Sequence, residues 1–286
     1  MKLTVIALGG NALQPPNKKW TYEELLKNIN KTVLHLKPLI SKYQIVLSHG
    51  NGPEVGNLLI QQKSTKDVPA MPLDVLDAMT QGQIGYLLQK SIQNILKKKA
   101  VSLVTQIEVD KNDKAFKNPT KPIGPYYKEK IEKQMIKEPE GWRKLVASPK
   151  PKRIIEIEEI KSLVKQGYIV IACGGGGIPV ANGKGIEAVI DKDYATQLLA
   201  TQLKADLLIF LTDVPYVYLN YETKPIAIKS MNIKEAKKYM KHFKAGSMKP
   251  KIEASIEFLK KGKKVIITKP ELLDKALERK AGTVIK

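Results

Sequence analysis

Residues 3–10 read LTVIALGG, a run of six mainly apolar residues that ends in two glycines. An apolar run of this length, with β-branched residues and a glycine boundary, is typical of a buried β-strand. Glycine lets the chain turn sharply at the end of the strand and leaves the backbone N–H groups open to a ligand. Further along the sequence the same order recurs: an apolar strand, a turn and an amphipathic helix.

Predicted strands and helices alternate through most of the chain. Strands are expected at about 3–8, 44–48, 101–107, 168–173, 207–211 and 264–267. A helix is expected after Thr21, with Glu24 as its capping-box partner, and further helices at about 55–62, 72–98, 155–165, from 194, 234–241 and 250–260. Such alternation indicates an α/β fold, with a mainly parallel sheet covered by helices on both faces.

Residues 108–151 interrupt this alternation. They are rich in lysine, proline and glycine, and their prolines are Pro119, Pro122, Pro125, Pro139, Pro149 and Pro151. Because a structureless loop of this length is unusual inside a compact domain, the segment is expected to be an insertion with a small structure of its own.

The composition is that of a globular protein, since 43% of the 286 residues are hydrophobic and 27% are charged. No apolar run is long enough to span a bilayer, and the N-terminus lacks the layout of a signal peptide. Cys173 is the only cysteine, which excludes an internal disulfide. The protein is therefore expected to be cytoplasmic.

The formal charge of +21 suggests a nucleic-acid-binding protein, because clustered lysines and arginines release counterions from phosphate backbones. The lysines, however, are spread over the whole sequence, and only residues 97–99 form a short run. Aromatic residues make up 6%, and no basic stretch is interleaved with aromatics for base stacking. A lysine-covered surface that attracts anionic substrates is favoured, and a basic nucleic-acid-binding protein is the alternative from another class.

Four turns follow predicted strands. They comprise residues 9–12 (Gly-Gly-Asn-Ala), 48–53 (Ser-His-Gly-Asn-Gly-Pro), 174–177 (four glycines) and 212–214 (Thr-Asp-Val). Ligands of parallel sheets bind beyond the carboxyl ends of the strands, so these turns are the expected binding segments. Glycine backbones approach phosphate oxygens closely, and a following helix N-terminus attracts anions. None of the turns is a Walker A loop.

Three lysines stand out by their context: Lys121 in TKPIGP, Lys192 between Asp191 and Asp193, and Lys251 in GSMKPK. Phosphoryl transfer needs little from a protein beyond alignment and positive charge near the phosphate oxygens, and lysine supplies a mobile point charge. Asp193 is suited to holding lysines in register by ion pairing. On composition alone, a catalytic role and a solvated surface role are about equally favoured for residues 191–193.

The other candidates for chemistry favour structural roles. His49 lies in a glycine turn, where contact with substrate and fixing of the loop are both open. His35 and His242 fall within helix patterns, and Cys173 ends an apolar strand with no histidine nearby in sequence. No Cys/His cluster has the spacing of zinc ligands. Magnesium is expected to arrive with ATP or ADP, bound mainly to the phosphates.

Over its whole length the sequence carries motifs that occur together in one group of enzymes. They are residues 7–12, 48–53, 72–74 (PLD), 119–125 (PTKPIGP), 141–143 (GWR), 148–151 (SPKP), 172–180, 187–193 (EAVIDKD), 246–248 and 250–251. In these motifs the chain resembles the carbamate kinases of the amino-acid-kinase superfamily. The glycine turns suit the whole superfamily, whereas residues 119–125 and 187–193 point to carbamate kinases in particular.

The resemblance implies a three-layer α/β sandwich of two lobes with a small protruding subdomain. Residues 1–165 would form the N-terminal lobe, which binds carbamate or carbamoyl phosphate and carries the subdomain, at about 108–151, as a lid. Residues 166–286 would form the C-terminal lobe, which binds ATP or ADP with Mg²⁺. The family further suggests a homodimer and a role in arginine metabolism.

The implied activity is reversible transfer of a phosphoryl group between ATP and carbamate, which forms from ammonia and bicarbonate, to give ADP and carbamoyl phosphate. The catalytic residues would be Lys121, Lys192, Asp193 and Lys251. The substrate-binding residues would be Gly9, Gly10, Asn11, Gly50, Asn51 and Gly52. The nucleotide-binding residues would be Gly174, Gly175, Thr212, Asp213, Val214, Tyr218 and Met248.

Three positions depart from related patterns. Relatives in the superfamily place a lysine before the first Gly-Gly, where this chain has Leu8, and Lys121 is expected to substitute for it. Glu54 stands where glutamine is expected, and Ala147 where proline is expected. A carboxylate near an anionic substrate weakens binding unless it points away or pairs with a lysine. Another superfamily kinase, acting on an acyl phosphate or a phosphate monoester, is the nearer alternative, and Leu8 and the insertion argue against it.

Overall fold

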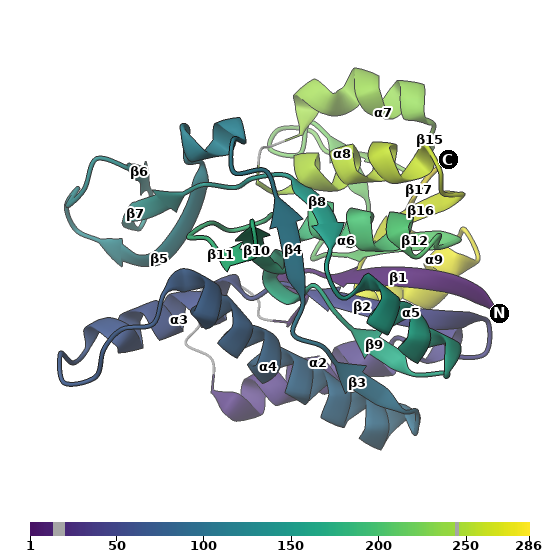
Figure 1. Ribbon diagram of the computed structural model, residues 1–286. Helices are drawn as coiled ribbons and strands as arrows, with labels where there is room; N and C mark the ends of the chain where they lie inside the picture. The colour runs from purple at the N-terminus through teal and green to yellow at the C-terminus, as the bar shows by residue number, and fades with distance from the viewer. Residues whose placement is uncertain (14–20, 244–245) are drawn as a thin grey trace.

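An eight-stranded central sheet organises the molecule, and the computed structural model describes residues 1–13, 21–243 and 246–286, without the side chains of Asn11 and Ala12 (Figure 1). In order across the sheet the strands are β15 (Ser230–Met231), β17 (Thr283–Ile285), β16 (Lys264–Thr268), β12 (Leu207–Leu211), β1 (Lys2–Leu8), β2 (Tyr43–His49), β9 (Ile169–Ile171) and β3 (Ala100–Ser102). Neighbouring strands are parallel except for β16 and β17. The predicted α/β class with a mainly parallel sheet is confirmed.

Helices cover both faces of this sheet. They are α1 (Gly10–Leu13), α2 (Tyr22–Leu34), α3 (Gly52–Lys63), α4 (Leu73–Ser91), α5 (Ile157–Lys165), α6 (Lys192–Gln202), α7 (Ile233–Tyr239), α8 (Met248–Leu259) and α9 (Leu273–Leu277). Alternate residues of β1 belong to different cores: Val5 and Ala7 pack with α5, α6, α7 and α8, whereas Ile6 and Leu8 pack with α2, α4 and α9. This alternation follows from the two-residue period of a strand and gives three layers.

The insertion has its own structure, as expected. Strands β5 (Lys121–Tyr127), β7 (Gly141–Val146) and β6 (Met135–Glu138) form a separate antiparallel sheet that protrudes to one side in Figure 1. Ile123 and Val146 of this subdomain share a small core with Val55 of α3, so the subdomain is seated on the first turns of that helix.

Two further small sheets complete the fold. One contains β11 (Lys184–Gly185), β10 (Ile178–Ala181), β4 (Gln106–Val109) and β8 (Pro151–Ile154), and the other pairs β13 (Val217–Leu219) with β14 (Ile226–Ile228). Within the described ranges, no helix is both long and apolar enough to cross a membrane.

Several sequence-based boundaries were wrong, and three of them are informative. The strand expected at 101–107 is two strands, β3 and β4, which pair in different sheets. The helix expected at 72–98 ends as an α-helix at Ser91 and continues as a π-helical turn to Leu96, before Lys97 adopts a left-handed conformation. The helix expected from 194 begins at Lys192, because the Asp191 carboxylate caps it by accepting the Asp193 N–H at 2.9 Å. By contrast, the capping box of Thr21 and Glu24 is present.

Candidate active site

The four predicted turns meet at one edge of the central sheet. They follow β12, β1, β2 and β9, which are consecutive parallel neighbours, so their carboxyl ends lie side by side. Gly9 N–H donates to Leu211 O at 2.9 Å, and Gly50 N–H donates to Leu8 O at 3.2 Å. Each bond fastens a turn to the last residue of the neighbouring strand, and the turns lie together at the carboxyl edge of the sheet, as predicted.

The glycines in the first two turns allow unusually close packing. A Cβ added to Gly9 would lie 2.8 Å from Leu211 O, and one added to Gly50 would lie 3.3 Å from Gly10 N and 3.8 Å from Lys192 Cδ. At Gly10 and Gly52 the same position is open, with nothing beyond the local helix backbone within 4 Å in the part of the chain that is described. The stem of Lys192 therefore runs beside a pair of turns whose backbone is accessible to a small ligand.

Lys192 and Lys251 converge on one carboxylate. Lys192 Nζ donates to Asp193 Oδ1 at 2.6 Å, and Lys251 Nζ donates to Asp193 Oδ2 at 2.9 Å. All three side chains are largely buried. Burial alone would raise the pKa of Asp193, but the two ammonium groups hold it well below its usual range. Two cations on one anion leave a net positive charge at the start of α6.

The two lysines respond differently to this environment. Burial lowers the pKa of Lys192, and the neighbouring Asp193 only partly offsets that effect. Burial also acts against the charge on Lys251, yet the Asp193 carboxylate raises the pKa of Lys251 above its ordinary value. Lys251 is therefore the more firmly charged of the pair.

Lys121 reaches the same place from the protruding subdomain. It is the first residue of β5, and its Nζ donates to Asp191 Oδ2 at 2.9 Å. Asp191 is also the N-cap of α6, so the three lysines gather around the first turn of one helix. Residues 191–193 follow an irregular segment and not a strand, and that segment makes one isolated bridge, between Ala147 and Ala188.

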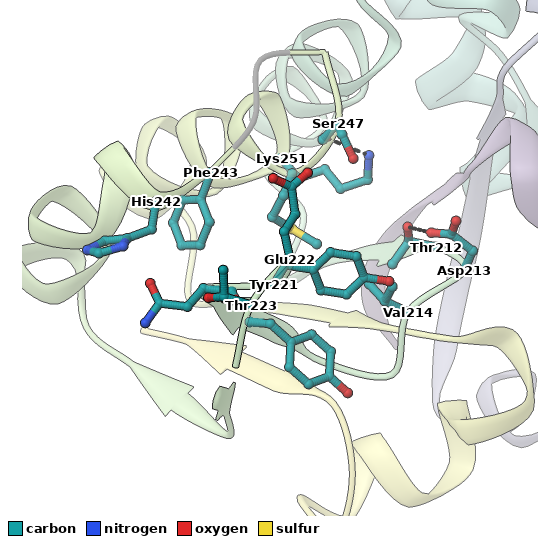
Figure 2. Close-up of a pocket in the computed structure, with 13 residues that line it drawn as sticks. Thr212, Asp213, Val214, Tyr221, Glu222, Thr223, His242, Phe243, Ser247 and Lys251 are labelled. Atoms are coloured by element: carbon teal, nitrogen blue, oxygen red, sulfur yellow. Dashed lines mark hydrogen bonds between the residues drawn. The ribbon is translucent and has the colours of Figure 1, made fainter. Parts of the chain in front are cut away.

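A cavity of about 520 Å³ opens beside Lys251 (Figure 2). It is lined by Thr212, Asp213, Val214, Tyr218, Asn220, Tyr221, Glu222, Thr223, His242, Phe243, Ser247, Met248 and Lys251. The first four and Met248 are predicted nucleotide-binding residues, and the structure brings them together. His242 was expected to be purely structural but lines the cavity. The hairpin residues 220–223 went unnoticed because the sequence NYET carries no strand or phosphate-turn signal.

Gly174 and Gly175 lie elsewhere, since the described residues that line the cavity include neither. A Cβ on Gly174 would lie 2.4 Å from His49 Nε2, and a Cβ on Gly175 would lie 2.1 Å from Asn51 Nδ2. Gly175, Gly176 and Gly177 all have positive φ. This left-handed backbone lets residues 174–177 pack closely against the turn that follows β2. These glycines thus support the first pair of turns and stand apart from the cavity.

A buried polar network fixes the turn after β2. Asn51 Nδ2 donates to Asp77 Oδ1 at 2.5 Å and to Thr80 Oγ1 at 2.8 Å. His49 is buried, its Nδ1 lies 3.1 Å from Gly50 O, and burial lowers its pKa to about 4. A neutral, buried histidine of this kind fixes the loop, which favours one of the two roles left open by the sequence. Asn11 lies in α1, and its side chain is outside the described part of the structure.

Comparisons with known proteins agree with this geometry. The family model described as "Amino acid kinase family" matches residues 2–269. "Carbamate kinase" of Pyrococcus horikoshii is 47% identical over 98% of each chain, and "Carbamate kinase 2" of Staphylococcus aureus strain RF122 is 48% identical over 98% of each chain.

Solved structures of the Giardia lamblia carbamate kinase resemble this fold over nearly the whole chain. The structure bound to AMP-PNP has a TM-score of 0.91 and 39% sequence identity, and it covers 99% of this chain and 98% of the Giardia chain. A second structure, thiocarbamoylated by disulfiram on a cysteine, has a TM-score of 0.89 at the same identity and coverage.

Proposed function

The chain belongs to the amino acid kinase family and, within it, to the carbamate kinases, and from this we propose that it transfers a phosphoryl group between ATP and carbamate through the lysines around α6. A carbamate oxygen attacks the γ-phosphorus while the bond to the ADP oxygen breaks, so the products are carbamoyl phosphate and ADP. The observation that carries the proposal is the pairing of Lys192 and Lys251 on Asp193, between the glycine turns and the cavity.

Lys192 and Lys251 would act on opposite sides of the transferring phosphoryl group. Lys251 lines the cavity and Lys192 passes beside Gly50, so one charge lies toward the nucleotide and the other toward the acceptor. Asp193 holds both ammonium groups in place before substrate arrives, which reduces the reorganisation needed in the transition state. Alignment and fixed positive charge are the main contributions that proteins make to phosphoryl transfer.

Carbamate would bind at the turns after β1 and β2. The proposed contacts are the backbones of Gly9, Gly10, Asn11, Gly50 and Gly52, together with the side chain of Asn51. The open backbone at Gly10 and Gly52, the N-terminus of α3 and the nearby Lys192 all favour a small anion. Gly174 and Gly175 would serve this site indirectly, by supporting His49 and Asn51.

ATP or ADP would occupy the 520 Å³ cavity, with the adenosine near Tyr218 and Met248 and the phosphates directed toward Lys251. Within the described ranges, no group of three or more His, Cys, Asp or Glu side chains could hold a metal ion. Asp191 and Asp193 are both ion-paired with lysines. This donor set fits Mg²⁺ that is carried by the nucleotide phosphates, where the ion would neutralise phosphate charge.

The chain would work as two lobes, residues 1–165 for carbamate and 166–286 for the nucleotide. The division is functional and leaves the sheet continuous, since β9 of the second half pairs with both β2 and β3 of the first. The subdomain at about 108–151 would act as a lid, because Lys121 ties it to Asp191 of the second lobe. Closure would exclude water from a substrate that decomposes in it.

A coupled assay with carbamoyl phosphate and ADP, scoring ATP formed, tests the proposed function. Lys192→Ala and Lys251→Ala should each lower kcat about a hundredfold or more, since charges aimed at a transition state are worth ~2.7–4 kcal/mol. Lys260→Ala, which removes an exposed lysine just beyond α8, is the control and should behave as wild type. Near-normal kcat in both Lys192→Ala and Lys251→Ala would contradict the assignment.

A further inference from the structure

We propose that Asp77 sets the preference of the enzyme for a substrate that carries an amino group, by fixing the amide of Asn51 with its oxygen toward the bound substrate. This inference rests on the proposed carbamate kinase activity and adds a specificity determinant to it. Asp77 lies in α4, one turn after the start of the helix, and is a positioning residue that acts through Asn51.

The orientation of the Asn51 amide follows from its partners. Burial raises the pKa of Asp77 to about 6, so at pH 7.5 the carboxylate is ionised and only accepts hydrogen bonds. Thr80 Oγ1 gives its own hydrogen to Asp77 O at 2.8 Å and must therefore accept from Asn51. The Asn51 atom that contacts both groups must be the NH₂, and both of its hydrogens are used.

The other end of the same amide is the part that remains available. Asn51 as a whole is only 6% exposed, and in the described part of the chain nothing donates a hydrogen bond to its Oδ1. The buried polar side-chain atoms without a partner in those residues are His35 Nε2 and Arg143 Nε, and Asn51 Oδ1 is not among them. An acceptor therefore remains at the turn after β2.

The rest of the proposed carbamate site consists of hydrogen-bond donors. The open turns offer backbone N–H groups, and Lys192 offers an ammonium group, all of which suit the carboxylate of carbamate. Only the NH₂ group of carbamate needs an acceptor, and Asn51 Oδ1 supplies one. A flipped amide would present NH₂ to NH₂ and leave the amino group of the substrate without a partner.

The packing around the pair is specific. A Cβ on Gly175 would lie 2.1 Å from Asn51 Nδ2 and 2.4 Å from Asp77 Oδ1, so only glycine allows the amide and the carboxylate to meet here. Gln81 Nε2 approaches Asp77 Oδ2 at 3.4 Å from the next turn of α4. The carboxylate is thereby held on the side of the amide away from Oδ1.

Carbamoyl phosphate and acetyl phosphate separate this role from a general structural one. They have nearly the same shape, with an amino group in one where the other has a methyl group. A site that accepts a hydrogen bond from the amino group disfavours the methyl analogue, because the buried acceptor is left unpaired. The wild-type enzyme should therefore phosphorylate ADP with a much larger kcat/KM from carbamoyl phosphate.

The test compares both phosphoryl donors in Asp77→Ala, Asp77→Asn and Thr80→Val, with folding checked by circular dichroism. In Asp77→Ala the preference for carbamoyl phosphate should fall at least tenfold, with little change for acetyl phosphate. Asp77→Asn keeps an acceptor for Asn51 Nδ2 and should retain most of the preference. Thr80→Val removes the second anchor and should cause a smaller fall, which provides the readout if Asp77→Ala does not fold.

An equal loss of kcat/KM with carbamoyl phosphate and acetyl phosphate would overturn the role of Asp77. An unchanged ratio of the two kcat/KM values in the folded variants would overturn it as well. Failure of the proposed function would look different, since the wild-type enzyme would then form no ATP from carbamoyl phosphate at all.

Discussion

Glu54 occupies the first turn of α3, beside the proposed carbamate site, and is buried. Burial raises its pKa from 4.5 to about 7. A carboxyl group whose pKa is raised in the folded state favours folding below about pH 4.5, and this contribution is lost as the pH rises through 7. Ionised Glu54 therefore destabilises the folded protein at pH 8.

Glu54→Gln should raise the free energy of unfolding at pH 8 by roughly 1–3 kcal/mol, because the buried amide carries no charge to desolvate. At pH 4, where Glu54 is neutral, the two proteins should be about equally stable. Urea unfolding at both pH values measures the difference. A gain of the same size at both would show that ionisation of Glu54 is not its cause.

Cys173 should be inert toward disulfiram, unlike the modified cysteine of the Giardia enzyme. Its side chain is fully buried, burial raises the pKa of its thiol, and the reactive species is the thiolate. Since it is the only cysteine, native protein should keep its mass and its activity after treatment. Protein unfolded in urea is the control and should be labelled once, as seen by mass spectrometry. Labelling of the native protein would mean that the end of β9 opens.

The three lysines and Asp193 could be selected as candidates from the sequence, but their arrangement in space could not. Their motifs marked them, but they lie far apart along the chain, with Lys121 and Asp191 separated by 70 positions. Only the fold brings their charges together. Asp77 gave no signal at all, because one acidic residue in a helix pattern resembles a solvated one. Its importance arises from a contact with Asn51, 26 positions away.

Among the elements, the long alternating ones were predictable and the short ones were not. The strand Leu207–Leu211 matches its prediction because five consecutive apolar residues are typical of a buried strand. Residues 101–107 read as one strand because apolar residues recur through them. The break arises from tertiary pairing, since β3 joins β9 while β4 joins β10. Strands of two to four residues, such as β11 and β13, have no periodicity to detect.

The junction of β5 and α6 carries a prediction at this scale. Asp191→Asn keeps a good N-cap for α6 but removes the charge that holds Lys121. The ion pair is partly exposed and is worth at most about 1 kcal/mol, so kcat/KM should fall by only about two- to fivefold, with folding stability nearly unchanged. Initial rates and thermal unfolding measure the two effects.

A double-mutant cycle with Lys121→Met separates the contact from other effects of the substitution. In the Lys121→Met background, Asp191→Asn should change kcat/KM very little, because the partner of Asp191 is already absent. If the loss has the same size in both backgrounds, the subdomain is held by other contacts.

For the whole molecule, the charge of +21 opposes self-association, so two copies should meet where the surface carries few lysines and arginines. Helix α4 offers such a place, because Lys90 is the only lysine or arginine among its 19 residues. Its inner face is buried in the core, yet Val75, Met79 and Tyr86 on the outside are exposed, at a spacing that forms one stripe. Gly82 lies in that stripe, and a Cβ added to it would have no neighbour within 4 Å among the described residues beyond the local helix backbone.

We therefore propose this stripe as the surface through which the expected homodimer would form. In a two-fold dimer the same helix from each copy meets its counterpart, and an apolar stripe is then complementary to itself. Gly82 would let the two helix backbones approach closely. A dimer of this kind buries side chains that would otherwise be the exposed apolar patch of a soluble monomer.

Met79→Asp should convert a dimer into a monomer, because it places a charge opposite its own copy in an apolar interface. Sedimentation equilibrium should give twice the mass of one chain for wild type and the mass of one chain for the variant. Ile131→Asp changes an apolar residue on the protruding subdomain that is more exposed than Met79, and this variant should remain dimeric. A dimer that survives Met79→Asp would exclude the α4 stripe as the interface, and a monomeric wild type would exclude the homodimer. Because the proposed catalytic lysines lie at the carboxyl edge of the sheet and the stripe lies on the outside of α4, a monomeric Met79→Asp should keep most of its kcat.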